Sequence, residues 1–166
     1  MVLQAITSVQ GCLIINGTRI ETAALQQITE VTPDQKFCDC LVNEANSNTN
    51  CESVVGDVNI ADLSSDTWNR IKEVHGTVHV EKTSVSDINH LENLKIVGWK
   101  TPALVISKNK NLIDISALLT MSIESKYKPI EIKDNPNICH AIDEEQKLKQ
   151  WLSGMKSSVK FSRKCR

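Results

Sequence analysis

The sequence has few aromatic side chains, which make up only 4% of its 166 residues. Its hydrophobic share is nevertheless 40%, and 23% of its residues are charged, a composition typical of a globular chain. The core must therefore be built from valine, isoleucine and leucine. The sequence also lacks an apolar run near the roughly 20 residues that a transmembrane helix needs. With 19 basic and 20 acidic residues, it lacks the basic excess that is typical of nucleic-acid-binding proteins.

Motifs of the common enzyme classes are missing as well. The sequence has no Gly-x-Ser-x-Gly elbow, no His-Glu-x-x-His pair and no Gly-Lys-Ser/Thr phosphate loop. His75 and His79 fall on one face of a predicted strand, but two imidazoles alone make a poor metal site, and exposed polar positions explain them better. We therefore predict a protein that is not an enzyme and that holds no metal and no cofactor.

The chain start and the cysteines give opposite indications about the compartment. No secretory signal follows Met1, since the first basic residue is Arg19 and no long apolar segment comes early. Against this, Asn16 opens a glycosylation sequon, which indicates an extracellular protein. An even number of cysteines favours disulfides over free thiols. The six are Cys12, Cys38, Cys40, Cys51, Cys139 and Cys165.

Zinc binding is the alternative use of these cysteines. Cys38, Cys40 and Cys51 could supply three thiolates to a metal ion. The cysteine pairs of zinc sites are usually separated by two to four residues, whereas only Asp39 lies between Cys38 and Cys40. No histidine lies nearby in the sequence, so the disulfide interpretation is favoured.

A repeated pattern runs through the second part of the chain. Short apolar alternations begin at Val58, Val78, Leu104 and Ile130, so that the first step is 20 and the next two are both 26. A polar turn follows each of the last three, and repeats at the same step of 26. Such a period predicts a solenoid, in which stacked coils bury a continuous core that one coil could not bury alone. The side chains predicted to face inward are Val58, Ile60, Val78, Val80, Leu104, Ile106, Ile130 and Ile132.

Two further features complete this prediction. Asn109 and Asn135 occupy equivalent turns, where an asparagine suits the corner and can form a ladder with its neighbour. Short helices are predicted over residues 67–71, with Ser64, Ser65 and Asp66 before them as candidate caps, and over residues 143–152. The apolar side of the second helix should close the end of the core. The fold class predicted is mainly β, a right-handed parallel β-helix with short capping helices.

The start of the chain resembles the later repeats. Seven positions from Ile6 to Ile20 match positions from Ile71 to Val85 at an offset of 65. Three more, from Leu25 to Val31, match at an offset of 66. Ten matches with a single slip indicate a further copy of the same structural unit.

The four ordered segments 50–63, 71–97, 103–115 and 130–142 resemble the receptor L-domain, the β-helical ligand-binding domain of insulin and epidermal growth factor receptors. The resemblance covers about Cys51 to Cys165. It implies a receptor L-domain at 51–165, a cysteine-containing connector at 34–50 and partial L-domain coils at 1–33, whose beginning we expect to be absent. L-domain segments without an attached kinase are similar to nematode proteins of this class.

The resemblance also implies the function and the disulfides. It implies an extracellular binding module, secreted or part of an ectodomain, with no catalytic activity. We expect a soluble receptor-like or decoy protein for an insulin-like or growth-factor-like peptide or protein. By the same resemblance Cys139 pairs with Cys165, and Cys51 pairs with Cys38 or Cys40, leaving the other for Cys12. The alternative is a structural or adaptor solenoid of the leucine-rich-repeat type without a hormone ligand.

Receptor L-domains hold ligand on the outward face of a parallel sheet, so the resemblance transfers that face and not individual contacts. The alternation places nine residues on it: Asp57, Asn59, Thr77, His79, Glu81, Val105, Ser107, Glu131 and Lys133. Binding surfaces usually offer buried aromatic or aliphatic anchors within a polar rim. Val105 is the only sizeable apolar side chain of the nine, so we expect weak growth-factor affinity.

Overall fold

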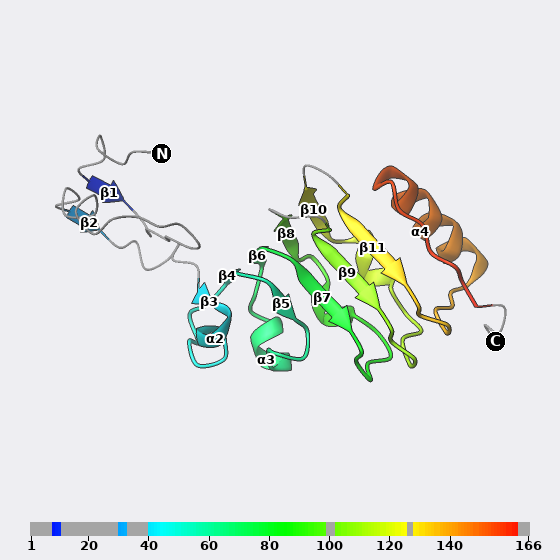
Figure 1. Ribbon diagram of the computed structural model, residues 1–166, viewed down its shortest axis with the longest axis horizontal. Helices are drawn as coiled ribbons and strands as arrows, with labels where there is room; N and C mark the ends of the chain where they lie inside the picture. The colour runs from blue at the N-terminus through cyan, green and yellow to red at the C-terminus, as the bar shows by residue number, and fades with distance from the viewer. Residues whose placement is uncertain (1–7, 11–29, 33–39, 99–101, 126–127, 163–166) are drawn as a thin grey trace. The chain divides into compact units, whose positions relative to one another are not determined.

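The computed structural model describes residues 8–10, 30–32, 40–98, 102–125 and 128–162. The chain divides into two compact units, Met1–Asp39 and Cys40–Arg166. In the first unit, β1 (Ser8–Gln10) and β2 (Glu30–Thr32) pair in parallel. The second unit contains two larger sheets (Figure 1), and all their strand pairs are also parallel.

The strands of the second unit alternate between its two sheets. The strand order is β10-β8-β6-β4-β3 in the five-stranded sheet and β11-β9-β7-β5 in the four-stranded sheet. From β4 to β11, each strand of one sheet is followed along the chain by a strand of the other. Their bounds are β3 Cys40–Leu41, β4 Ser53–Val55, β5 Val58–Asn59, β6 Glu73–His75, β7 Val78–Glu81, β8 Lys95–Gly98, β9 Leu104–Ser107, β10 Ser122–Ser125 and β11 Ile130–Lys133.

Helical turns lie between several of these strands, and the structure is mixed α/β. The prediction of a mainly β fold was wrong in this respect, because the strands are only two to four residues long in the second unit whereas the last helix has 13 residues. The α-helices are α2 (Val42–Ala45), α3 (Ser65–Trp68) and α4 (Ile142–Gly154), and the 3-10 helices are η1 (Asn89–Leu91) and η2 (Ser116–Leu119).

The register of the four-stranded sheet stacks equivalent side chains into columns. Leu104 pairs with Val78 on one side and with Ile130 on the other, and all three are fully buried, as predicted. Of the eight side chains predicted to face inward, Ile132 is half-buried against the core and the other seven are buried. Burial of each large aliphatic side chain contributes about 1.5–3 kcal/mol.

A glycine corner separates the two sheets within each of the first repeats. Gly56 (φ +125°) lies between β4 and β5, and Gly76 (φ +157°) lies between β6 and β7. A Cβ on Gly76 would lie 2.2 Å from the carbonyl oxygen of Gly56, so the close approach of the two corners requires glycine. The sequence pattern predicted one strand face from Val74 to Val80, but this corner divides it between two sheets.

A buried ladder of polar side chains joins the opposite corners. Asn109 Nδ2 donates to the Val80 carbonyl (2.7 Å), and Asn135 Nδ2 donates to the Ile106 carbonyl (2.9 Å). The Asn135 Oδ1 accepts from the Asn109 backbone N–H (3.0 Å) and side-chain amide (3.1 Å). The Asn109 Oδ1 in turn accepts from the Thr83 N–H (2.9 Å) and hydroxyl (2.8 Å). This confirms the predicted asparagine ladder.

The residue before each rung of the ladder has a left-handed backbone. These residues directly follow β7, β9 and β11, and they are Lys82 (φ 55°), Lys108 (φ 59°) and Asp134 (φ 58°). Such a conformation is unfavourable for residues other than glycine. The side-chain hydrogen bonds of the ladder hold the chain in it, so the same turn recurs in three successive repeats.

Two of the helices were predicted from the sequence. Ser64 caps α3, because its hydroxyl accepts the Thr67 N–H at 3.2 Å. α4 begins one residue before and ends two residues after the predicted range 143–152. Leu148 and Leu152 of α4 are buried, and Trp151 packs half-buried against the core, as the predicted cap requires.

Candidate binding face

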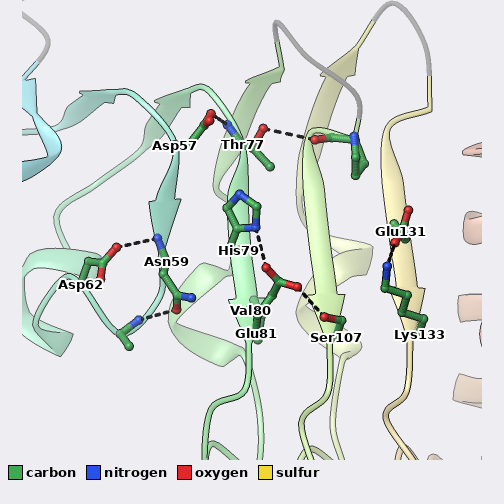
Figure 2. Close-up of polar contacts among 12 residues, drawn as sticks. Asp57, Asn59, Asp62, Thr77, His79, Val80, Glu81, Ser107, Glu131 and Lys133 are labelled. Carbon is green, nitrogen blue, oxygen red and sulfur yellow. Dashed lines mark hydrogen bonds and ion pairs between the residues drawn. The ribbon is translucent and has the colours of Figure 1, made fainter.

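The nine residues predicted for the outward face lie on the four-stranded sheet or directly before its strands. One row across the strands consists of Asn59, His79, Val105 and Glu131, and a second row consists of Glu81, Ser107 and Lys133. Asp57 and Thr77 precede β5 and β7. Figure 2 shows eight of the nine, all but Val105, labelled on this sheet.

Three of the nine are buried. Val105 is 8% exposed, Thr77 5% and Ser107 0%. In the register Val105 lies between His79 and Glu131, whose longer side chains flank it. The only sizeable apolar residue of the face is therefore largely covered, and the surface that a partner meets is polar.

A hydrogen-bonded group occupies the centre of the face. His79 Nδ1 lies 3.0 Å from Glu81 Oε2, and the Ser107 hydroxyl donates to Glu81 Oε1 at 2.5 Å (Figure 2). The hydrogen bond from Ser107 is the main cause that lowers the pKa of Glu81, although burial acts in the opposite direction. Glu81 is therefore a fixed negative charge at neutral pH.

This group is not arranged for nucleophilic catalysis. In a serine hydrolase the imidazole lies between the hydroxyl and the carboxylate and removes the hydroxyl proton. Here the Glu81 carboxylate lies between Ser107 and His79 and binds both. The arrangement fixes the orientation of three side chains, which is what a preformed binding surface requires.

A second charged group lies on β11. Lys133 and Lys128 both contact Glu131, and the hydrogen bond from Lys133 is the main cause that lowers the pKa of Glu131. The same contact raises the pKa of Lys133. Because these ion pairs are exposed, they contribute little to stability and remain accessible to a partner.

The polar side chains near β5 form hydrogen bonds with backbone groups. Asp57 Oδ1 accepts the Thr77 N–H at 2.9 Å, and Thr77 Oγ1 donates to the Pro102 carbonyl at 3.3 Å. The Asn59 N–H donates to Asp62 Oδ2 at 2.9 Å (Figure 2). These contacts connect neighbouring repeats and shape the loop after β5.

A groove that the sequence analysis missed lies beside this face. It has a volume of about 520 Å³ and lies between the loop after β5 and the corner after β7. Its floor includes Ile60, Leu63 and Trp68, and Glu81 of the sheet face also lines it. The signal in the sequence was the first repeat step, from Val58 to Val78, which is shorter than the two later steps.

The histidines noted in the sequence are not neighbours on one face. His75 lies on β6 of the five-stranded sheet, 3.4 Å from Glu73, while His79 lies on β7 of the other sheet. The alternation suggested a common face because the glycine corner between them was not apparent. Among the described residues, no group of three candidate ligands could hold a metal ion.

The structure connects two of the cysteines. Cys40 and Cys51 form a disulfide with a Cα–Cα distance of 5.9 Å, so Cys51 pairs with one of its two expected partners. This bond removes two of the three thiolates that the zinc alternative needs. Cys139 is also disulfide-bonded. Cys12, Cys38, Cys165 and the sequon residue Asn16 lie outside the described residues, so the pairing of Cys139 with Cys165 stays a prediction.

Comparison with known families decides the classification of this chain. The family model described as Receptor L domain matches residues 50–150. The chain belongs to the receptor L domain family. Receptor L domains are extracellular ligand-binding modules and not enzymes. The comparison with curated proteins finds no match. Among the helices within the described ranges, none has the length and apolar character to cross a membrane.

Proposed function

We propose that this receptor L domain is a non-catalytic extracellular module that binds a peptide or protein on the outward face of its four-stranded sheet. The observation that supports it is the central group of His79, Glu81 and Ser107, whose hydrogen bonds fix a charged surface before any partner binds. A preorganised surface loses less side-chain entropy on association. The ligand classes that we propose are insulin-like and growth-factor-like peptides, for which the chain would serve as a soluble receptor-like or decoy protein.

The experiment measures binding of the full oxidised chain to a panel of insulin-like and growth-factor-like peptides by surface plasmon resonance. His79→Asp and Glu131→Lys each change charge on the face without removing buried apolar area. Glu124→Lys is the matched control, because Glu124 is exposed on β10 of the other sheet. We expect about tenfold weaker binding for each face variant and no change for the control.

Two results would contradict the proposal. Equal affinity of both face variants and the unmodified chain would place the ligand elsewhere. Absence of binding to the whole panel would favour the structural or adaptor role. The buried ladder of Asn109 and Asn135 also fits that role, because an asparagine at this position belongs to the leucine-rich-repeat consensus.

We further propose that the alternating strands wind as a right-handed parallel β-helix. Connections between parallel strands of one sheet are right-handed in nearly all proteins. A β4-to-β6 connection that passes through β5 of the other sheet completes one turn of such a helix. An experimental structure that shows left-handed turns would contradict it.

The domain organisation is part of the same proposal: L-domain-like repeats at 1–33, a connector at 34–50 and a receptor L domain at 51–165. In the first unit Val9 pairs with Val31, and in the second Val74 pairs with Ile96, so the two pairs have the same spacing along the chain. In these strand pairs Val31 is equivalent to Ile96, whereas the sequence match aligned it with Val97. The offset of 65 between the two copies therefore continues as far as β2. Limited proteolysis of the full chain should cleave first within 34–50. First cleavage inside 51–150 would contradict these boundaries.

The extracellular location is supported by the Cys40–Cys51 disulfide, since disulfides persist in oxidising compartments. Alkylation of the natural protein without reduction should leave both cysteines unmodified, as peptide mapping by mass spectrometry would show. Quantitative alkylation of either cysteine would indicate a reducing compartment instead.

A further inference from the structure

The groove beside the sheet face exists because two neighbouring repeats differ in length. The step from Val58 of β5 to its partner Val78 of β7 is 20, whereas the step from Val78 to its partner Leu104 of β9 is 26. The corner after β7 therefore has no equivalent partner in the shorter repeat before it. Its exposed side forms one wall of the groove, and the loop after β5 forms the other.

The floor of the groove is apolar, and its side chains are mostly covered: Ile60 and Leu63 are each 5% exposed and Trp68 is 3% exposed. In the later repeats the carbonyls of Val80 and Ile106 accept from ladder asparagines. In the short repeat the equivalent carbonyl, that of Ile60, accepts from the Trp68 indole Nε1–H at 2.9 Å. Trp68 thus replaces the missing asparagine rung, and its ring packs beside Ile60 and Leu63 as the floor. Val85, which is half-buried, adds apolar surface on the opposite wall.

The rim of the groove carries more negative than positive charge. Asp62 is exposed on one wall, and Glu81 lies on the other, beside the cation of Lys82. His90 also lines the groove, and burial is the main cause that lowers its pKa, so it is uncharged at neutral pH. Asp87 acts electrostatically on this imidazole and adds a further acid nearby.

We propose that this groove binds a bulky apolar side chain of a peptide together with an adjacent arginine or lysine. The apolar side chain would lie against the half-buried Val85 and the small exposed part of Trp68, and the cation would lie beside Asp62 and Glu81. The inference rests on the proposed function, and it adds the apolar contact that the polar sheet face alone does not offer to a ligand. Ligand pockets usually combine apolar contacts with a few placed polar groups. This groove has apolar residues on its floor and at Val85, and its remaining walls are polar.

The probe is the capped dipeptide acetyl-phenylalanyl-arginine amide, titrated into the full oxidised chain and followed by two-dimensional NMR of the ¹⁵N-labelled protein. The uncharged comparison is the citrulline analogue, which has nearly the same shape. We expect saturable shifts at the Trp68 indole and at the Thr83 and Val85 amides, with the arginine probe binding about two- to fivefold more tightly, as for an exposed charge pair.

Three variants test the placement. Asp62→Asn keeps an acceptor for the Asn59 N–H and should remove the preference for arginine. Ala61→Trp, on the exposed wall, should fill the groove and abolish the shifts. Glu124→Gln removes an exposed acid from β10 of the other sheet and should change nothing.

The inference is overturned if neither probe gives saturable shifts in the groove, if both bind equally well, or if the shifts change in the Glu124→Gln variant. Because the dipeptides need no natural ligand, this result is separate from the peptide panel. Dipeptide binding with an inactive panel supports the groove and rejects the hormone ligand. A panel ligand that binds the Ala61→Trp variant unchanged rejects the groove alone.

Discussion

The asparagine ladder is the feature whose removal should destabilise the fold most specifically. Asn109 is fully buried, and its side chain bonds the Val80 carbonyl, the Thr83 N–H and hydroxyl, and Asn135. Asn109→Ala removes all of these bonds and leaves two backbone groups without their partners. An unsatisfied buried group costs about 1–3 kcal/mol, so the loss should be about 2–6 kcal/mol. Thr83 is only half-buried, so water can replace one bond and the value should fall in the lower half.

The assay is urea unfolding of the full oxidised chain, followed by circular dichroism, with Asn111→Ala as the control. Asn111 is exposed in the same loop, so its substitution should change the unfolding free energy by less than about 0.5 kcal/mol. An Asn109→Ala loss as small as that of the control would refute the energetic role of the ladder.

Asn109→Asp provides a second measurement with a definite pH dependence. The aspartate keeps the acceptor for Thr83 but cannot donate to the Val80 carbonyl. Burial should raise its pKa in the folded state, so the variant should be more stable at acid pH and should lose stability as the pH rises through that pKa. A variant whose stability falls with decreasing pH would contradict this account.

Three further changes probe other parts of the structure. Gly76→Ala should destabilise the fold by about 2–5 kcal/mol through backbone strain and overlap with the neighbouring corner. The control Gly154→Ala, with no atom within 4 Å of the new Cβ, should be neutral or stabilising. Equal effects of the two variants in urea unfolding would show that the glycine corner is not required. Leu104→Ala should cost about 2–5 kcal/mol by the same assay, and a loss under about 1 kcal/mol would mean that the column is not tightly packed. The pKa of Glu81 is lowered in the folded state, so Glu81 contributes stability that is complete above its unfolded pKa and is lost as the pH falls through its folded pKa. Ser107→Ala should raise the folded pKa of Glu81 in an NMR titration. An unchanged pKa would reject the hydrogen bond as the cause.

The sequence predicted the four-stranded sheet well because its last two repeats have the same length. The step from Leu104 to Ile130 equals the step between the ladder residues Asn109 and Asn135, which is 26. A fixed step places identical corners in register, so the turn, the strand and the buried column all repeat together. The family match to residues 50–150 agrees with the resemblance carried by these same segments.

The five-stranded sheet could not be read in the same way. Its stacked residues are Val54, Val74, Ile96 and Ile123, and the three steps between them all differ in length. Helical turns of different lengths lie between the strands and absorb the differences, so no single period connects these positions. Each of these four strands also has only three or four residues, too few for alternation to identify it.

The candidate site shows where a repeating pattern stops being informative. Alternation predicted Val105 on the outer side, in the row of His79 and Glu131. Its exposure depends on the side chains of the neighbouring strands, which lie one whole repeat away along the chain in each direction. The groove has a different origin, a repeat that is shorter than those after it. Regular repeats build the core and the flat polar sheet, whereas the groove that we propose as the apolar anchor site lies where the repeat is interrupted. A longer loop inserted after Ala61 to restore the step of 26 should therefore close the groove and leave the columns of the core intact.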